Sequence, residues 1–467
     1  MTLACLGPAT AGIVGRDTLA RAVGVPVHFA SHQLCSAIFV AGLDSTQFFN
    51  EAIKPKLGPV GALLRYEVDR ELQEVRTSLA GLAHSRAIYD GPFGCRVIHR
   101  GREARFFRGE TDDHQPPVAS SPPLAGRGIG VPVNAELSEA LDHAFAESDS
   151  GPRRYTKAVV VLHRGRIVGE RYAEGVTPAT SLIGWSMTKS VTNALLGILV
   201  RYGKLDMYEP ATIAEWSTPG DPRQAITPDQ LLRMLSGIGC GQSLHNSGFR
   251  TLFDADTQME YDMADQSAFA ANASLRAKPG SEWRYTNCNF VLLSRIIRNA
   301  VGPDASAARN FIARELFEPL GFEHATLEYD SAGVPLGTIH LWASARDWAR
   351  FGLLYLLDGV AENGRRILPE GWVDYSAKLT PQSADEYGYG AGFWTQRGNS
   401  AAARERIAVG WPADSFMAAG SQGQYTIVIP SQNLVIVRIG WAYTPNDDRV
   451  AVERLVRETI AATQSEK

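Results

Sequence analysis

Short apolar runs separated by turn residues predict strands at both ends of the larger part of the chain. Residues 158–162 and 167–170 flank a His-Arg-Gly-Arg turn, which predicts a β-hairpin. Residues 425–429 and 434–439 flank a Pro-Ser-Gln-Asn turn and predict a second hairpin. A further strand is predicted over residues 389–396.

Apolar residues with helical spacing lie between these strand signals. One helix is predicted from the N-cap candidate Asn134 to about Glu147, and another over residues 191–200. The segment 205–357 is mostly helical with Gly- and Pro-rich loops, and a last helix is predicted over residues 449–461. The pattern therefore predicts an α/β fold of the α+β type: one antiparallel sheet, flanked by helices, with an inserted all-helical domain.

A Pro- and Ser-rich stretch divides the chain into two parts. Residues 115–132 contain paired prolines and are predicted to form an extended linker. Residues 133–467 after it carry the predicted sheet and helices. Residues 1–114 before it form an N-terminal extension of unknown role. They contain short β-type runs such as residues 37–40 and 96–99, but no catalytic pattern.

Composition and charge exclude several classes of function. The chain has 467 residues, of which 45% are hydrophobic and 21% charged, as in soluble globular proteins. The net charge of −4 and the absence of a basic stripe argue against nucleic acid and membrane surfaces as partners. No apolar run approaches the roughly 20 residues that span a bilayer. A small molecule is the expected partner, and a homodimer is compatible with the sequence. The cytoplasm is the expected compartment for the chain as given, or the periplasm if the true start lies upstream.

The five cysteines are Cys5, Cys35, Cys95, Cys240 and Cys288, and no pair has the close spacing of a zinc or redox site. Cys35 and Cys95 would form a disulfide in an oxidising compartment. Five buried free thiols are the alternative. The ten histidines lack a metal-type spacing, so no metal is expected.

Candidate chemistry begins with the tetrapeptide Ser186-Met187-Thr188-Lys189, just before the predicted helix over residues 191–200. Residues three apart on a helix lie on one face, which would bring the Ser186 hydroxyl near the Lys189 amine. A serine hydroxyl becomes a strong nucleophile when a nearby base takes its proton. A lysine can be that base if burial lowers its pKa. The alternative is a helix start with a capping serine and an exposed lysine.

Two later segments can complete an acyl-transfer site. Arg284-Tyr285-Thr286-Asn287 precedes an apolar helix, and Tyr285 could share a proton with Lys189. Gly420-Ser421-Gln422-Gly423-Gln424 opens a strand, where glycine allows close approach and a backbone N–H could face an oxyanion. The alternatives are a tyrosine at a capped helix start and an ordinary β-turn.

The order, spacing and flanks of these segments resemble the class C-like branch of the serine β-lactamase/penicillin-binding superfamily. That branch includes DD-peptidases, family VIII carboxylesterases and 6-aminohexanoate-dimer hydrolases. Of its three motifs, Ser-x-x-Lys matches at residues 186–189 and Tyr-x-Asn at residues 285–287, whereas Ser421-Gln422-Gly423 replaces Lys/His-Thr-Gly. The resemblance covers roughly residues 130 to 460. It includes flanking sequence at 231–237, 316–321 and 343–352.

The resemblance implies a role for each matching catalytic position. Ser186 would be the nucleophile that forms an acyl-enzyme, and Lys189 would be its base. Tyr285 would relay a proton to the leaving group and help to activate the hydrolytic water. No metal or cofactor is implied, because both half-reactions are acyl transfers.

The resemblance also implies which groups bind the substrate. Asn287 would hydrogen-bond Lys189 or a substrate carbonyl. The backbone N–H groups of Ser186 and Gln424 would form the oxyanion hole, and Ser421 and Gly423 would border the substrate.

The implied activity is a serine hydrolase for small esters or amides, either a carboxylesterase or a 6-aminohexanoate-oligomer-type amidase. The neutral Ser421 argues against an efficient β-lactamase. The dimer hydrolases use an acidic residue soon after the Leu-rich segment to meet the substrate amine, but here no acid falls before Asp254. We interpret Asp254, Asp256 and Glu260 as surface acids of the helical domain. β-lactamase or DD-peptidase activity, acyl transfer, and a penicillin-recognising sensor with negligible turnover remain alternatives.

Other candidates have a structural interpretation that we favour. A lone histidine, His340, is expected to be structural rather than to face the cleft. Aromatic residues that would line an acyl pocket are expected to be core residues: Trp185, Tyr261, Trp283, Trp394 and Trp411.

Overall fold

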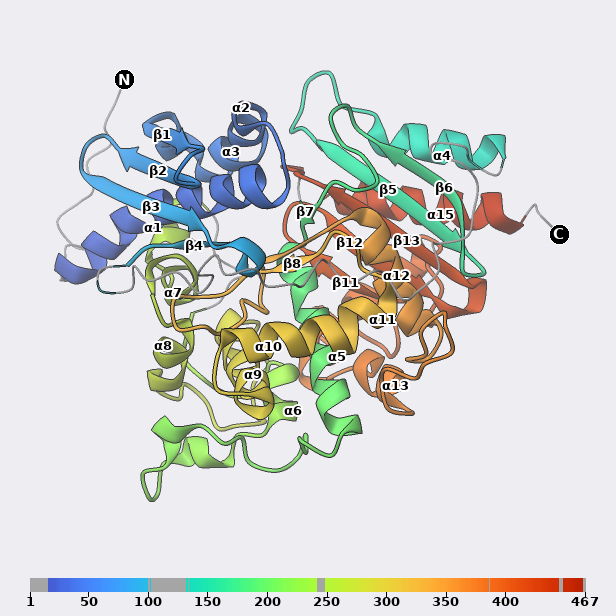
Figure 1. Ribbon diagram of the computed structural model, residues 1–467. Helices are drawn as coiled ribbons and strands as arrows, with labels where there is room; N and C mark the ends of the chain where they lie inside the picture. The colour runs from blue at the N-terminus through green and yellow to red at the C-terminus, as the bar shows by residue number, and fades with distance from the viewer. Residues whose placement is uncertain are drawn as a thin grey trace.

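The computed structural model describes residues 16–99, 101, 132, 134–241, 248–385, 387–444 and 448–464. The predicted linker lies outside these residues except for residue 132. The described strands form three antiparallel sheets, which the helices surround and connect (Figure 1).

A six-stranded sheet with the order β10-β11-β12-β13-β5-β6 joins the two ends of the larger part of the chain. Its strands are β5 (Thr156–His163), β6 (Arg166–Tyr172), β10 (Trp394–Thr395), β11 (Phe416–Gly420), β12 (Gln424–Ile429) and β13 (Leu434–Gly440). β13 pairs with β5, from Leu434 opposite His163 onward. Both predicted hairpins are confirmed. The strand predicted over residues 389–396 is wrong for most of its length, because only β10 is a strand and Tyr389 forms a single bridge with Trp394.

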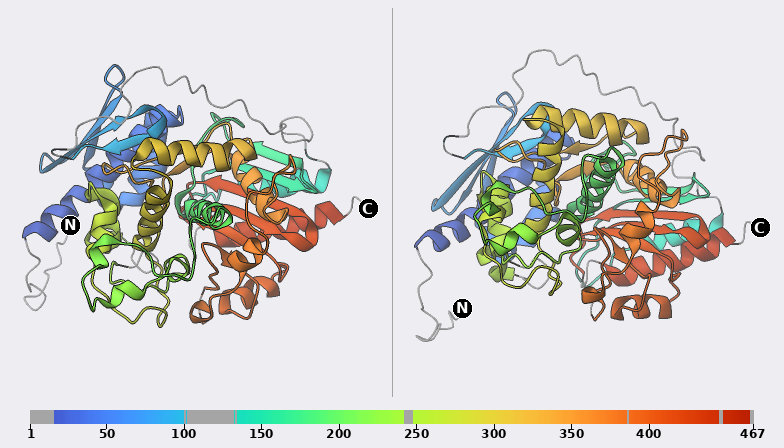
Figure 2. Two further views of the ribbon diagram at one scale, coloured as in Figure 1. Left: turned by 60° about the horizontal axis from the view of Figure 1, so that its bottom comes forward. Right: turned by 90° about the horizontal axis from the view of Figure 1, so that it is seen from below.

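Helices cover both faces of this sheet, as Figures 1 and 2 show. On one face, α4 (Ala135–Phe145) packs on β5 and β6 and against α15 (Arg449–Gln464), and the apolar side chains of both helices share a cluster with sheet residues. On the other face, α12 (Ala345–Leu356) packs on β12, β13 and β5. Because the strands are covered on both sides, they are nearly continuous apolar runs. The two helices predicted at the ends of this part are confirmed.

The helical segment lies between the sheet-forming parts. It contains α5 (Thr188–Arg201), α6 (Pro228–Leu232), α7 (Ala255–Asp262), α8 (Gln266–Asn272), α9 (Asn287–Val301), α10 (Ala305–Ile312) and α11 (Glu318–Leu320), and α13 (Trp372–Ala377) and α14 (Ala401–Ala408) follow α12. A small sheet with the order β7-β9-β8 interrupts it, built from β7 (Leu182–Ile183), β8 (Thr326–Leu327) and β9 (Leu341–Ala343). Strands this short carry no detectable periodicity, which is why the sequence did not reveal them.

The N-terminal unit is a four-stranded sheet with the order β1-β2-β3-β4 and a long helix packed on it. Its elements are α1 (Arg16–Cys35), α2 (Ser45–Phe48), α3 (Lys54–Leu57), β1 (Leu64–Asp69), β2 (Glu74–Leu79), β3 (Ala83–Tyr89) and β4 (Cys95–Val97). Figure 1 shows this unit in blue beside α7. The strand predicted over residues 37–40 is wrong, because Ser36–Val40 is a π-helical turn that continues α1.

One stretch of this unit has the length and composition of a membrane span. Val23–Val40 has a mean hydropathy of 1.3 over 18 residues. The expectation that no apolar run is long enough to cross a bilayer is therefore wrong for this stretch. The structure buries 72% of the stretch, as in the core helix of a globular protein. Its composition is therefore explained by packing and does not show a membrane span.

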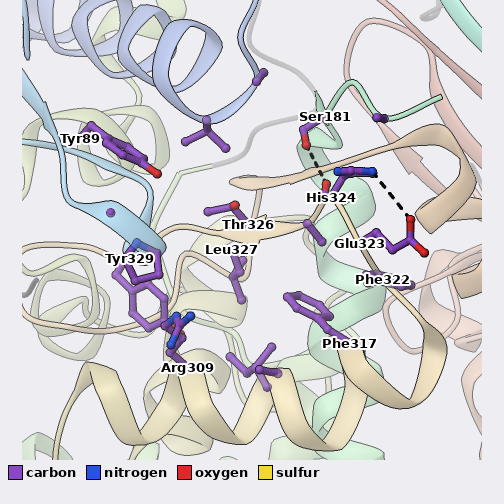
Figure 3. A pocket seen from close by; sticks show the side chains of 18 of the residues that line it. Tyr89, Ser181, Arg309, Phe317, Phe322, Glu323, His324, Thr326, Leu327 and Tyr329 are labelled. Atoms are coloured by element: carbon purple, nitrogen blue, oxygen red, sulfur yellow. Dashed lines mark hydrogen bonds and ion pairs between the residues drawn. The ribbon is translucent and has the colours of Figure 1, made fainter. Parts of the chain in front are cut away.

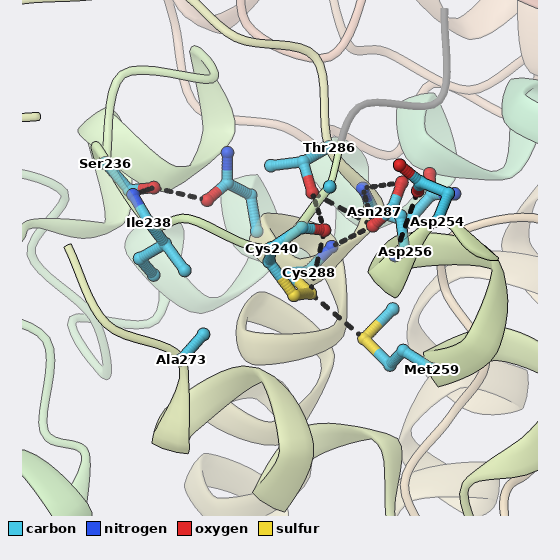
Figure 4. The surroundings of a disulfide bond; sticks show 12 residues. Ser236, Ile238, Cys240, Asp254, Asp256, Met259, Ala273, Thr286, Asn287 and Cys288 are labelled. Atoms are coloured by element: carbon cyan, nitrogen blue, oxygen red, sulfur yellow. Dashed lines mark hydrogen bonds between the residues drawn. A yellow bond between two sulfur atoms is a disulfide. The ribbon is translucent and has the colours of Figure 1, made fainter. Parts of the chain in front are cut away.

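Two disulfides tie distant segments together. Cys35–Cys95 joins the end of α1 to β4 and is the pairing that the sequence suggested for an oxidising compartment. Cys240–Cys288 joins the loop after α6 to the first turn of α9 across 48 residues (Figure 4). The second pairing was not predicted, because the sequence gives no local spacing signal for it.

The N-terminal unit shares one hydrophobic core with the rest of the chain. Phe48 is 2% exposed, and its ring lies 6.1 Å from Trp342 and 5.1 Å from Trp441, centroid to centroid. Phe29 of α1 stacks on Trp185 at 6.3 Å. The unit therefore packs directly against the turn that carries Ser186.

Because the core is shared, a substitution in it should destabilise the whole protein. Phe48→Ala should lower the free energy of unfolding by about 3 to 5 kcal/mol, because it removes a buried aromatic ring and leaves a cavity. Chemical denaturation followed by tryptophan fluorescence measures the change in a single transition. Leu63→Ala is the control, since Leu63 is 56% exposed. An early, separate transition of the N-terminal unit would contradict the shared core.

Candidate active site

Ser186 lies in a tight turn between β7 and α5. The 3-10 turn Trp185–Met187 runs directly into α5. Trp185 has a φ of 46°, a left-handed conformation that is unfavourable for a residue with a side chain. The Thr188 hydroxyl donates to the Trp185 carbonyl at 2.7 Å and holds the turn. Ser186 is partly exposed at this position, whereas Lys189 is 1% exposed.

Lys189 contacts the Ser186 hydroxyl directly. Its Nζ donates to Ser186 Oγ at 3.0 Å and to the Thr338 carbonyl at 3.2 Å. Its Nζ also lies 5.0 Å from the centroid of the Tyr285 ring and 5.7 Å from that of Phe290. Burial lowers the pKa of Lys189 to about 8. An amine with this pKa is neutral in about a tenth of molecules at pH 7, which makes it available as a base.

Tyr285 reaches the same hydroxyl from another element. It precedes α9, is 3% exposed, and its side chain is hydrogen-bonded to Ser186. Burial raises the pKa of Tyr285 above its ordinary value, and the hydrogen bond with Ser186 opposes this effect. The phenol therefore keeps its proton near neutral pH. The structure thus brings the three predicted catalytic side chains together around one oxygen atom.

Asp256 fixes the first turn of α9, directly after Tyr285. Its carboxylate accepts hydrogen bonds from the Asn287 N–H at 2.8 Å, the Cys288 N–H at 3.2 Å and the Thr286 hydroxyl at 2.9 Å. The Cys240–Cys288 disulfide holds the same turn from the other side, as Figure 4 shows. A negative charge at a helix N-terminus is stabilising. These contacts set the position of Tyr285.

The interpretation of the nearby acids as surface residues is wrong for two of them. Asp256 is 1% exposed and Glu260 is 8% exposed. Both carboxylates act electrostatically on Lys189, raising its pKa and partly offsetting the effect of burial. Burial, and then repulsion from Asp256, raise the pKa of Glu260 well above its ordinary value. Sequence reasoning missed these residues because acids in a polar segment look like a solvated face.

Asn287 lies beside the site, and its side-chain oxygen is a hydrogen-bond acceptor without a described partner. It is 5% exposed, and its side-chain oxygen has no hydrogen-bond partner among the described residues. The described hydrogen bonds of Lys189 go to Ser186 and Thr338, so the structure does not join Asn287 to Lys189. A buried amide oxygen without a partner is costly unless a ligand supplies one.

β11 ends against the backbone of Ser186. A Cβ atom on Gly420 would lie 2.4 Å from the Gly184 carbonyl oxygen and 2.9 Å from the Ser186 nitrogen, so only glycine fits here. Gly420 is paired with Gln424 across the β11–β12 hairpin. The structure therefore brings Gly420 into contact with the Ser186 turn, and places Gln424 on the neighbouring strand.

The rest of the third segment is held by hydrogen bonds within the hairpin. Gln424 donates to the Ser421 carbonyl at 3.1 Å and accepts from the Gly440 N–H at 3.0 Å. The Gly423 carbonyl accepts from Arg438 at 2.8 Å. Gln424 is fully buried, whereas Ser421 is partly exposed. Ser421 is therefore the residue of this turn that is open to a ligand.

Gln422 links this turn to Trp185, which precedes Ser186, and to the N-terminal unit. It accepts from the Trp185 indole N–H at 2.9 Å and donates to the Tyr443 hydroxyl at 2.7 Å. Tyr443 in turn donates to the Ala52 carbonyl at 2.5 Å. The sequence placed Gln422 in the third segment but indicated no role for its side chain, because its partners lie far away along the chain.

Two of the five candidate aromatics lie beside Tyr285. Trp394 stacks on Tyr285 with a centroid distance of 5.5 Å, and Trp283 lies at 6.4 Å. Both are partly exposed and can contact a substrate. Trp411 belongs to the core cluster under α15, and Tyr261 packs on Phe29, so both are core residues.

Two buried groups have donor atoms of the metal-binding type: His32, Glu328 and His340, and Cys240, Asp256 and Cys288. In the first group, His32 pairs with Glu328 at 3.0 Å and stacks on His340 at 4.4 Å. Burial holds the pKa of His340 well below its ordinary value, and the ring is fully buried, as expected for a structural histidine. In the second group, the sulfurs form the disulfide, so internal contacts explain that group.

A cavity of about 720 Å³ lies apart from this site, between the N-terminal sheet and α10 (Figure 3). Tyr89, Arg309, Phe317 and His324 are among its lining residues, and Ser186 is not. The hydroxyl of Ser186 and its partners Lys189 and Tyr285 are not among the residues that line this cavity.

Comparison with known proteins identifies the family of the chain. The family model described as Beta-lactamase matches residues 141–461. A 6-aminohexanoate-dimer hydrolase of Paenarthrobacter ureafaciens is 25% identical over 232 residues, which are 47% of this chain and 56% of that protein. The match therefore spans little more than half the length of that relative.

Solved structures show the same fold. A Bacillus anthracis protein described as a candidate 6-aminohexanoate-dimer hydrolase has a TM-score of 0.58 and 23% identity over 75% of this chain and 89% of its own. EstCE1, described as a hydrolase with promiscuous acyltransferase activity, has a TM-score of 0.52 and 14% identity over 70% of this chain and 98% of its own. Since the family model covers more than half of its residues, the chain belongs to the β-lactamase family, within the serine β-lactamase and penicillin-binding protein superfamily.

Proposed function

We propose that this chain is a serine hydrolase that forms an acyl-enzyme on Ser186 and hydrolyses small esters or amides. The observation that carries the proposal is the 3.0 Å contact between Ser186 Oγ and the buried Lys189 amine, whose pKa is lowered to about 8. Tyr285 at the same hydroxyl supplies the second proton carrier that acyl transfer needs.

Acylation proceeds by proton transfer within this group. Neutral Lys189 takes the Ser186 proton as Oγ attacks the carbonyl carbon and forms a tetrahedral intermediate. As the intermediate collapses, Tyr285 donates its proton to the departing alcohol or amine and recovers a proton from Lys189. The ester of Ser186 remains, and the site carries no net change in protons. Deacylation repeats the steps with water as the nucleophile and Ser186 as the leaving group.

Backbone N–H groups stabilise the oxyanion. The Ser186 N–H is one donor. The contact between Gly420 and the Ser186 backbone supports a second donor directly after Gly420, at Ser421. Gln424, the donor expected from the sequence, lies opposite Gly420 on β12 and is a less direct candidate. One such donor contributes about 3 kcal/mol of transition-state stabilisation.

Three features favour a small ester or amide as substrate. The unpartnered Asn287 oxygen can accept a hydrogen bond from a substrate N–H, and Trp283 and Trp394 offer apolar surface next to Tyr285. Ser421 stands where the family's third motif has a cation for a β-lactam carboxylate. The relative from Paenarthrobacter ureafaciens, described as a 6-aminohexanoate-dimer hydrolase, supports an amide or ester rather than a β-lactam.

Loss of the nucleophile tests the proposal. Ser186→Ala should reduce kcat/KM for p-nitrophenyl butyrate by about a thousandfold or more, because no other group can carry the acyl chain. Ser217→Ala, at an exposed serine, should leave the rate unchanged. Rapid quenching and peptide mass analysis should find the butyryl group on Ser186 in the wild type. Full activity of Ser186→Ala would refute the assignment.

The pKa of Lys189 sets the pH dependence. Because the neutral amine is the active form and its pKa is about 8, kcat/KM should rise about tenfold per pH unit below 8 and level off above it. The raised pKa of Tyr285 keeps the phenol protonated across this range, so no decline is expected before strongly alkaline pH. A flat profile from pH 6 to 9 would exclude Lys189 as the base.

The charge of Asp256 should influence the pH dependence of kcat/KM. Asp256→Asn removes a negative charge that raises the pKa of Lys189, so the midpoint should move to lower pH. The plateau rate should also fall, because the α9 turn that positions Tyr285 loses its charged acceptor. Glu282→Gln, at an acid of the same segment whose side chain is 43% exposed, is the control. An unmoved midpoint would show that Asp256 has only a structural role.

A further inference from the structure

A buried group of polar side chains joins the N-terminal unit to the larger part of the chain. His32 belongs to α1, Glu328 directly follows β8, and His340 directly precedes β9. One nitrogen or carboxylate oxygen from each of the three lies within 4.8 Å of those of the other two. His32 is 4% exposed, and the other two are fully buried. Bulk water therefore does not supply the polar contacts of this group.

The contacts within the group leave three of its atoms without hydrogen bonds. His32 Nε2 and Glu328 Oε2 are 3.0 Å apart, but without the alignment of a hydrogen bond. Neither of these atoms has a hydrogen-bond partner among the described residues, and His340 Nδ1 has none either. A buried polar atom without a partner is costly. Three such atoms in one place therefore indicate a bound ligand that contacts all of them.

The remaining atoms of the group are held by neighbouring residues. Glu328 Oε1 accepts hydrogen bonds from Ser36 Oγ at 2.7 Å and from the Cys95 N–H at 2.8 Å, so Oε2 is the oxygen that remains. His340 Nε2 is hydrogen-bonded to the side-chain amide of Gln33 at 3.2 Å, so Nδ1 is the nitrogen that remains. Residues that bind metal ions in proteins are typically oriented in this way, by hydrogen bonds to their other polar atoms.

Two imidazoles and one carboxylate are donors that zinc prefers. Zn²⁺ binds histidine nitrogens and glutamate oxygens at about 2.0 to 2.2 Å. Two ligands of one ion at these distances are roughly 3.0 to 3.5 Å apart, and the 3.0 Å between His32 Nε2 and Glu328 Oε2 fits this separation. Mg²⁺ and Ca²⁺ prefer oxygen ligands alone, so the two histidines favour a transition metal.

We propose that His32, Glu328 and His340 bind a structural zinc ion that joins α1 of the N-terminal unit to the segment between β8 and β9. Zinc sites usually have four ligands. The fourth is a water molecule or the side-chain oxygen of Gln33, which is buried without a described partner. The sequence gives no spacing signal for this site, because its ligands come from distant segments. The inference is independent of the proposed hydrolase function.

The site is also linked to the surroundings of Lys189. The segment between β8 and β9 carries Thr338, whose carbonyl accepts a hydrogen bond from Lys189 Nζ at 3.2 Å. Within the same segment, the Glu328 N–H donates to the His340 carbonyl at 3.1 Å, which closes the segment into a loop. A metal ion bound by Glu328 and His340 therefore stabilises the loop that supplies one of the two described hydrogen-bond partners of the Lys189 amine.

Metal analysis of the purified protein tests the proposal. The full chain, produced without a histidine tag and dialysed against a weak chelator, should contain about one zinc ion per molecule by plasma mass spectrometry. X-ray absorption at the zinc edge should show nitrogen and oxygen neighbours at about 2.0 to 2.2 Å and no sulfur. Glu328→Gln should lose the ion, because a neutral amide is a poor zinc ligand, although its oxygen can still accept from Ser36 and Cys95.

Thermal unfolding gives a second measurement. Excess EDTA should lower the Tm of the wild type by several degrees, because the ion binds the folded chain and not the unfolded one. The Tm of Glu328→Gln should not respond to EDTA. His28→Gln is the matched control, since His28 lies one turn earlier on α1 and pairs with Asp262 at 3.0 Å. This variant should retain both the zinc and the response to EDTA.

The wild-type measurements decide the question even if Glu328→Gln fails to fold. A wild type that lacks stoichiometric zinc, with a Tm that EDTA leaves unchanged, would overturn the proposal and identify the contact between His32 and Glu328 as an internal ion pair only. Sulfur neighbours around the zinc, or full retention of the ion by Glu328→Gln, would place the ion elsewhere and would also overturn it.

Discussion

The contact between Ser186 and a dehydrated Lys189 is the interaction on which the site depends. A lysine in water stays protonated at neutral pH and cannot take a proton from serine. Here α5 is buried beside β11 and α9, and the Lys189 amine is left with Ser186 and the Thr338 carbonyl as hydrogen-bond partners among the described residues. The fold lowers the pKa of this amine because the elements packed around α5 exclude water from it.

Residues from distant parts of the chain hold the buried surroundings of Lys189 in place. Asp256 and the Cys240–Cys288 disulfide hold the first turn of α9, and with it Tyr285, against the amine. Gly420 lets β11 approach the Ser186 backbone closely. The N-terminal unit packs Phe29 on Trp185, so a region without a catalytic pattern in its sequence contacts the residue that precedes Ser186.

The sequence predicted the elements whose pattern is local. The β5–β6 and β12–β13 hairpins have long apolar runs around clear turns, and Ser186 and Lys189 share a face because of their spacing. The burial of Asp256 and Glu260 was not predictable, since it results from packing of α7 against α1. The link between Trp185 and Gln422 spans 237 residues and depends on the closed sheet. Local pattern thus predicted that Ser186 and Lys189 meet, whereas the burial of the residues around them depends on tertiary packing.

The rate of Ser186 modification by a fluorophosphonate, measured from pH 6 to 10 in the wild type and in Lys189→Met, tests the central claim most directly. The account predicts that labelling of the wild type accelerates with pH around a midpoint of about 8. Lys189→Met should label slowly and without this midpoint. The same pH dependence in both proteins would show that Lys189 does not activate Ser186, and would contradict the account.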